Sequence, residues 1–145
     1  MTVISFSVPG IPAPAGSTRA IPFRRRDGRL GVSVLPASTR LRDWQATIRI
    51  AARQAAGDRR LMTGPLRVGL LFTLPRPKSH YGKRGLRPAA PPYPAGHPDL
   101  DKLTRAVLDA LTGVIFGDDA QVVSLAAEKV YGEAGQCMVI VMRHK

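Results

Sequence analysis

The chain has 145 residues, with 22 Lys and Arg against 10 Asp and Glu, so its formal net charge is +12 and its sequence pI is about 11.2. This length fits a single domain over residues 1–145, and a hydrophobic fraction of 44% is enough to form a core. So large an excess of cations favours a polyanionic partner, with nucleic acid as the first candidate, over a solvated basic surface or a ribosome-associated scaffold protein.

Three further features narrow the class of protein. Cys137 is the single cysteine, which excludes an intrachain disulfide. The first residues, "MTVISFSVPG", lack the basic region and long apolar run of a signal peptide. No apolar run approaches the roughly 20 residues that a membrane span needs. We therefore expect a soluble, cytoplasmic protein whose partners include neither a membrane nor a small-molecule cofactor.

The first part of the chain predicts a strand and then a basic hairpin. Apolar residues alternate in "TVISFSV", residues 2–8, as is typical of a half-buried strand. The run "AIPFRRRDGRLGVSVL", residues 20–35, predicts a hairpin that turns at Asp27-Gly28. The cations of its tip are candidate contacts for a phosphate backbone: Arg24, Arg25, Arg26 and Arg29.

A helix and a central strand are expected next. Ser38 or Thr39 can cap the helix, and Gly57 ends it. Its apolar residues recur at spacings of three and four, and Trp44 lies on that stripe, so we expect a core tryptophan rather than a base-stacking platform. In "LRVGLLFTL", residues 66–74, apolar side chains share one face, which predicts a central strand.

Residues 75–98 form a proline-rich segment that contains no acidic residue. Its prolines exclude a lasting helix or an interior strand. We expect either a mobile basic arm that orders on a phosphate backbone or a floppy insertion without function. The cations that would serve such an arm are Arg76, Lys78, Lys83, Arg84 and Arg87.

Two more strands are predicted near the end, in "AQVVSLAAEKVY", residues 120–131, and "CMVIVM", residues 137–142. The segment "GEAGQ" would join them in a second hairpin, with Met138, Ile140 and Met142 buried. The order of elements predicts an α+β domain in which two main helices pack on a mostly antiparallel or mixed sheet.

Half of the acidic residues lie in "HPDLDKLTRAVLDALTGVIFGDD", residues 97–119: Asp99, Asp101, Asp109, Asp118 and Asp119. Residues 99–111 have helical spacing. Asp99 and Asp101 in the first turn can offset the helix dipole. Arg105 can pair with Asp101 and with Asp109 at i,i+4 spacing, and Asp118 and Asp119 can be turn residues before a strand. Each of these structural roles is an alternative to a catalytic one.

The acids taken together favour a metal site. Asp99 and Asp101 lie close together where a loop meets the helix, and Mg²⁺ takes few carboxylates, several waters and substrate phosphate. A helix of this length spans about 18 Å, and an extended segment from Gly113 to Asp119 covers about 20 Å. Asp119 can thus return to Asp101 within one chain, or a dimer partner can supply it. Such an ion would polarise a phosphate and activate water in a basic, DNA-attracting protein.

The stretch "PDLDKLTRAVLDALTGVIFGDDAQVV", residues 98–123, resembles the signature of the RusA family of Holliday-junction resolvases. That signature has a D-[LIV]-D-N-L motif, a helix ending in "LDAL", and "DDAQV". The resemblance implies a homodimeric, Mg²⁺-dependent endonuclease that acts on four-way DNA junctions, with Mn²⁺ able to replace Mg²⁺. It also implies that Asp99, Asp101 and Asp119 are the catalytic and metal-binding residues, with Asp118 secondary.

Two positions depart from the family pattern. Lys102 stands where the family has Asn, and Arg105 stands where it has a catalytic Lys. Arg remains cationic and can clamp phosphate, but it is a poor proton donor, so Lys102 is the alternative for that role.

The resemblance implies resolution of Holliday junctions by paired symmetric nicks, in DNA recombination and repair. Two other functions stay open from the sequence: a non-catalytic basic DNA-binding protein whose acids cap helices, and a related nuclease that cuts flap or duplex DNA. For the homodimer, exposed edge strands or the apolar "GVIF" segment, residues 113–116, could pair across the axis.

Overall fold

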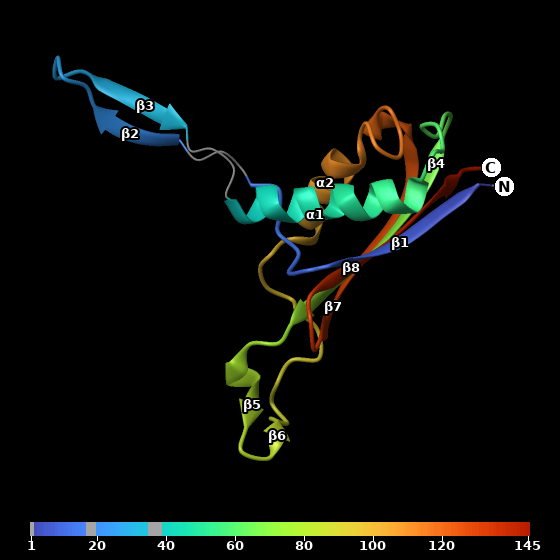
Figure 1. Ribbon diagram of the computed structural model, residues 1–145. Helices are drawn as coiled ribbons and strands as arrows, with labels where there is room; N and C mark the ends of the chain where they lie inside the picture. Colours follow the sequence, from blue (N-terminus) through green and yellow to red (C-terminus); the bar gives the residue numbers. More distant parts are fainter. Residues whose placement is uncertain (1, 17–19, 35–38) are drawn as a thin grey trace.

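A four-stranded mixed sheet forms the centre of the protein (Figure 1). The computed structural model describes residues 2–16, 20–34 and 39–145. The strand order is β1-β8-β4-β7, where β4 is parallel to β7 and the other neighbours are antiparallel. The strands are β1 (Val3–Pro9), β4 (Leu66–Pro75), β7 (Val122–Gly132) and β8 (Gln136–Arg143). Helices α1 (Thr39–Ala56) and α2 (Leu100–Leu111) cover one face of this sheet, so the predicted α+β fold is confirmed.

The core lies between the two helices and the sheet. The expected stripe of α1 is buried there, and Trp44 is a core residue with 4% of its surface exposed. The helix begins at Thr39 and is followed by Gly57, whose φ of +58° is the left-handed conformation typical of a helix end. Ser38, the other candidate cap, lies outside the described residues, as does Leu35 of the predicted hairpin.

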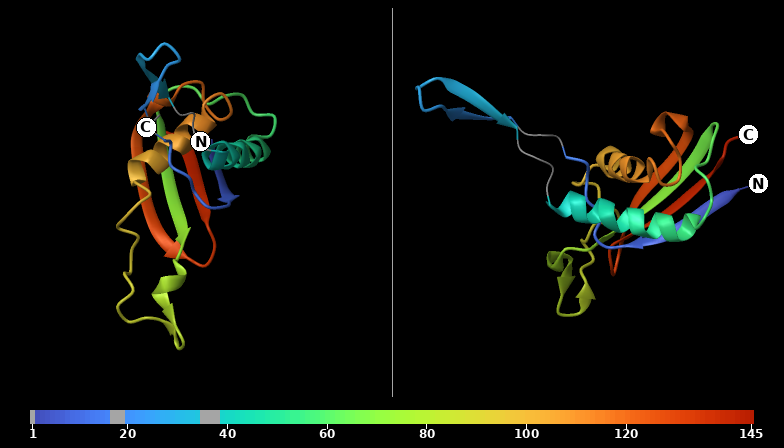
Figure 2. Two further views of the ribbon diagram at one scale, coloured as in Figure 1. Left: turned by 90° about the vertical axis from the view of Figure 1, so that its left-hand side faces the viewer. Right: turned by 45° about the horizontal axis from the view of Figure 1, so that its top comes forward.

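Two smaller hairpins project from this body in different directions (Figures 1 and 2). The first consists of β2 (Ala20–Arg24) and β3 (Leu30–Val34), as predicted, with Gly28 at φ +84° in its turn. The second lies in the proline-rich segment and contains a 3-10 turn, η1 (Lys78–His80), with the short strands β5 (Tyr81–Gly82) and β6 (Gly85–Leu86). This segment therefore has local structure of its own, and its role as a basic arm that orders on a phosphate backbone stays a prediction.

The prediction of a hairpin between β7 and β8 is wrong. Strand β4 lies between them, and the connection crosses the end of β4. Glycines allow this crossing, because a Cβ on Gly132 would collide with Thr73 Cγ2 and one on Gly135 would lie 2.7 Å from Gly10 O. Short sequence separation favours pairing of neighbours, but here the parallel β4–β7 pair takes precedence.

The expected facing of β8 is also wrong. Met138 and Ile140 are 50% and 37% exposed, and Met142 is half-buried, whereas Cys137, Val139 and Val141 are in the core. Both alternations of "CMVIVM" are apolar, so the sequence pattern does not select a face, and the helices cover just one. Burial raises the pKa of the Cys137 thiol to about 12 and keeps it protonated, as befits a core residue.

No helix in the described part of the chain is both long and apolar enough to cross a membrane.

Candidate active site

A groove of about 580 Å³ runs beside α2 and contains acids from both halves of the acidic stretch. Helix α2 supplies Asp101 and Arg105, the segment before β7 supplies Asp119, and β7 itself supplies Leu125 and Ala127. The remaining lining residues are Leu100, Thr104 and Leu108 of α2. The fold therefore brings two of the three candidate carboxylates and one candidate cation to a single groove.

Asp99 faces a neighbouring hollow instead. It is the N-cap residue of α2, with φ −70° and ψ 137°, but its side chain caps no backbone N–H. Its carboxylate is 3.0 Å from His97 Nδ1 and 3.6 Å from Lys102 Nζ. All three residues line that second hollow. A capping hydrogen bond from the side chain therefore does not account for Asp99.

Asp118 and Asp119 have different surroundings although they are adjacent. Asp118 precedes the 3-10 turn η2 (Asp119–Gln121), and its Oδ1 accepts a hydrogen bond from Ala120 N at 2.9 Å. Gln121 Oε1 in turn accepts from Asp118 N at 3.0 Å, which completes a capping box. Asp118 thus holds the turn, and Asp119 is the acid that lines the groove.

The chain reaches Asp119 by a different path from the expected one. After α2, Gly113 N donates to Phe116 O at 2.7 Å, and Gly113 has φ +85°, so the segment turns tightly rather than running extended. Ile115 and Phe116 are 1% and 0% exposed. Because the "GVIF" segment packs into its own core, it is not available to pair across a dimer axis as the sequence suggested.

The three predicted metal ligands are not gathered around one point. Among residues 2–16, 20–34 and 39–145, no three His, Cys, Asp or Glu side chains lie close enough together to hold a metal ion. Asp101 and Asp119 nevertheless fit Mg²⁺, which is commonly bound through one or two carboxylates, with waters and substrate phosphate as the other ligands. Both side chains are exposed on the groove, and Asp101 Oδ1 accepts from Lys102 N at 2.9 Å.

The two candidate cations are divided in the same way as the acids. Arg105 lines the groove with Asp101 and Asp119, and its Nε is 4.0 Å from Asp109 Oδ2, which confirms the predicted pair with Asp109. Lys102 lies with Asp99 in the second hollow. Arg105 is therefore the cation that shares a groove with the two exposed acids.

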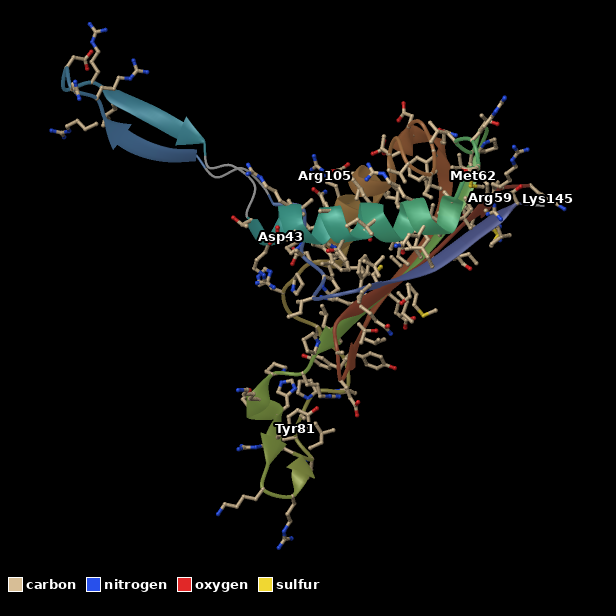
Figure 3. The ribbon with its side chains drawn as sticks, viewed as in Figure 1. Asp43, Arg59, Met62, Tyr81, Arg105 and Lys145 are labelled. Carbon is tan, nitrogen blue, oxygen red and sulfur yellow. The ribbon has the colours of Figure 1, made fainter. Side chains whose placement is uncertain are left out.

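The candidate DNA-binding cations also fall into two groups. Arg24, Arg25, Arg26 and Arg29 are exposed on the tip of the β2–β3 hairpin, where nitrogen-tipped side chains spread into solvent (Figure 3). Lys78, Lys83, Arg84 and Arg87 are exposed on the second hairpin.

Arg76, in contrast, has structural contacts. Its guanidinium carbon is 4.4 Å from the centre of the Tyr131 ring, and its Nη1 donates to Pro91 O at 2.8 Å. We therefore assign Arg76 to holding the proline-rich segment against β7.

Sequence reasoning missed two side chains that support the site. Gln121 Nε2 donates to Met62 O at 3.0 Å and to Gly64 O at 3.1 Å, so it ties the turn before β7 to the loop before β4. Lys129 Nζ donates to Gly96 O at 2.6 Å and to Pro98 O at 2.8 Å. A charged residue in the alternation of "AAEKVY" was the available signal for Lys129, because it shares a sheet face with apolar neighbours.

A groove with two exposed acids on a strongly basic α+β domain suits a nuclease. The family model described as Endodeoxyribonuclease RusA matches residues 12–142, which cover both hairpins, both helices and the groove. The protein belongs to this family, and the resemblance drawn from residues 98–123 is confirmed. The chain is also similar to uncharacterized protein YqaN of Bacillus subtilis (strain 168), with 28% identity over 144 residues, which are 97% of this chain and 96% of that protein.

Proposed function

We propose that the protein is an Mg²⁺-dependent, structure-selective endodeoxyribonuclease that resolves Holliday junctions by paired symmetric nicks in recombination and repair. The observation that carries this proposal is the groove in which Asp101 and Asp119 lie with Arg105, in a chain of net charge +12 from a nuclease family. Without a cation, these acids would repel DNA. With a bound cation, the same acids can serve phosphodiester hydrolysis as metal ligands.

Asp101 and Asp119 would hold the ion, and Asp99 would join them after its carboxylate leaves His97 and Lys102. A bound Mg²⁺ or Mn²⁺ supplies Lewis-acid polarisation of the scissile phosphate and a more acidic water. Arg105 can donate to non-bridging phosphate oxygens, and its planar guanidinium suits that geometry. Lys102, once parted from Asp99, is the side chain able to give a proton to the leaving oxygen, since Arg is a poor donor.

The test compares four substrates of identical sequence: a four-way junction, a 5′ flap, a linear duplex and a single strand. We expect cleavage of the junction in Mg²⁺ and none in EDTA, with the flap and duplex cut far more slowly. Faster cleavage of the flap or the duplex would select the related-nuclease alternative. Binding without cleavage in either Mg²⁺ or Mn²⁺ would select the non-catalytic DNA-binding protein.

The affinity for junction DNA should fall steeply as salt increases, because the two projecting hairpins present cations to phosphates. If about six phosphates are engaged, the log–log slope of the association constant against salt is roughly −5. Replacing Arg24, Arg25 and Arg26 together with Gln should reduce that slope to about −2.5, since each lost contact removes about 0.9. Fluorescence anisotropy with labelled junction measures both slopes.

Arg59→Gln is the control for that experiment, because Arg59 is an exposed arginine in the loop after α1. It lies at the end of the protein opposite to the first hairpin (Figure 3). This variant should leave the slope unchanged. A salt response that is flat in the wild type, or equal in the triple variant, would rule out phosphate binding by the first hairpin.

Asp118→Asn should reduce the cleavage rate less than tenfold. Asn keeps an oxygen that can accept from Ala120 N, so the capping box survives, and losing a cap altogether costs only about 1 kcal/mol. Single-turnover cleavage of the junction checks this. A complete loss of cleavage in Asp118→Asn, with an active Asp119→Asn, would exchange the roles of the two acids.

We also propose that the protein works as a homodimer, because a four-way junction is close to two-fold symmetric and its resolution needs two opposed nicks. The open face of the sheet, which the helices leave uncovered, supports this proposal. A hollow of about 920 Å³ on that face is lined by Gly69, Leu71, Met138 and Ile140, and Glu128 is its one charged lining residue. Copies that each carry a charge of +12 repel one another least through a surface with so few charged residues.

A further inference from the structure

One face of β7 connects the groove to the proline-rich segment. Ala127, Lys129 and Tyr131 are paired with Leu70, Phe72 and Leu74 of β4 and point with them towards the helices. Along this face Ala127 lines the groove, Lys129 contacts the chain just before α2, and Tyr131 lies under Arg76. A single strand face therefore contacts the groove, the start of the acidic motif and the base of the second hairpin.

Lys129 is the member of this row with the most specific contacts. Its half-buried ammonium donates to Gly96 O at 2.6 Å and to Pro98 O at 2.8 Å. These are charge-assisted hydrogen bonds, which are shorter and about twice as strong as neutral ones. Both acceptors are main-chain carbonyls, so the side chain fixes the path of the backbone rather than another side chain.

That backbone leads directly into the acidic motif. Pro98 is followed by Asp99, Leu100 and Asp101, and Leu103 N donates to Asp99 O at 3.0 Å as the helix begins. The preceding residues come from a hairpin that projects away from the sheet (Figure 2). Lys129 ties the last residues of that segment to β7 immediately before the helix that carries Asp101.

We propose that Lys129 is a positioning residue, which acts through the carbonyls of Gly96 and Pro98 to hold Asp99 and Asp101 where a divalent cation can join them to Asp119. This inference rests on the proposed function for its metal. It assigns no contact between Lys129 and DNA or metal. It differs from the roles of Arg105 and Lys102, which would act on the phosphate.

The test uses Lys129→Met, which keeps the length of the side chain and loses its donors, and Lys129→Arg, which keeps charge and two parallel donors. Lys145→Met is the control, because it removes an equal charge from an exposed position at the end of the chain. Partners that orient metal ligands typically change metal affinity or activity by about 10–100-fold when removed. We expect a loss of that size in the saturating single-turnover rate of Lys129→Met, recovery in Lys129→Arg, and no change in Lys145→Met.

Two further measurements separate positioning from other roles. Mn²⁺ binding, followed by the EPR signal of the free ion, should weaken in Lys129→Met by about tenfold or more. The salt slope of junction binding should stay unchanged, whereas loss of a phosphate contact would reduce it by about 0.9. A reduced slope with a normal saturating rate would make Lys129 a DNA contact and would overturn the proposal.

Hydrogen exchange followed by mass spectrometry tests the inference without reference to cleavage. Peptides covering residues 93–103 should exchange faster in Lys129→Met than in wild type, and those of β8 should not. Faster exchange with a normal cleavage rate and normal Mn²⁺ binding would show a merely structural role and would overturn the proposal. Unchanged exchange would also overturn it. If Lys129→Met does not fold, Lys129→Gln is measured in its place, with the same expected results.

The proposed function can fail separately. If wild type cuts no junction in Mg²⁺ or Mn²⁺, the assigned activity is wrong, and the exchange and Mn²⁺ measurements still decide the role of Lys129.

Discussion

Asp101→Asn and Asp119→Asn should each reduce junction cleavage by about a thousandfold, which corresponds to several kcal/mol of lost metal-dependent stabilisation of the transition state. Both acids line the groove, and neither side chain forms part of a capping box. Affinity for the junction should stay the same or rise, because a negative charge that repels phosphate has been removed. Single-turnover cleavage and anisotropy measure the two effects on the same protein.

Asp109→Asn is the matched control, since Asp109 is an exposed acid of the same helix that pairs with Arg105 at 4.0 Å. It should cost less than about tenfold in rate, because an exposed ion pair contributes little. Asp99→Asn should behave like Asp101→Asn if its carboxylate leaves His97 and Lys102 when the ion binds. Near wild-type rates in the Asp99, Asp101 and Asp119 variants would place the active site elsewhere.

Ile140→Asp should convert the protein from a dimer to a monomer. The substitution places a charge at the centre of the open sheet face, where Ile140 is 37% exposed, and burying an unpaired carboxylate in an interface is strongly unfavourable. Sedimentation should give about twice the chain mass of 15.6 kDa for wild type and the chain mass for the variant. Ile50→Asp is the control, since Ile50 is a 57% exposed isoleucine on α1.

The proposed homodimer also leads to an expected result for the reaction. A mixed dimer of one wild-type chain and one Asp101→Asn chain should nick one strand and leave most junctions half-resolved. A protein that stays monomeric at all concentrations and still cuts both strands in one encounter would contradict this part of the account.

Periodicity correctly predicted those elements that have one apolar face and one polar face. The first strand with Ile4 and Val8 inward, the helix that buries Trp44 and the hairpin at Asp27-Gly28 all formed as expected. The prediction of which side chains of β8 are buried was wrong, because both faces of this strand are apolar. The prediction that β7 pairs with β8 was wrong, because strands that are close in sequence need not be neighbours in a sheet. The glycines that allow the crossing cannot be recognised from the local sequence.

Spacing within the acidic stretch allowed Asp119 to return to Asp101 within one chain, with a dimer partner as the alternative source, and the groove contains both residues of one chain. The orientation of Asp99 was not predictable, because it depends on the nearby side chains of His97 and Lys102 and on the path of the preceding chain. The roles of Arg76 and Lys129 were equally impossible to predict from the sequence. Their partners are main-chain carbonyls and the ring of Tyr131. The parallel pairing of β4 with β7 brings Arg76 near that ring, and the path of the chain before α2 brings Gly96 O and Pro98 O to Lys129.

The most direct test of a metal-dependent junction resolvase is the product formed from a supercoiled plasmid that extrudes a cruciform. Two symmetric nicks across the four-way junction convert the plasmid to linear DNA, whereas one nick gives an open circle. We predict linear product in Mg²⁺, none in EDTA, and none from a plasmid of equal length that lacks the inverted repeat. Open circles alone, or equal cutting of both plasmids, would contradict the account.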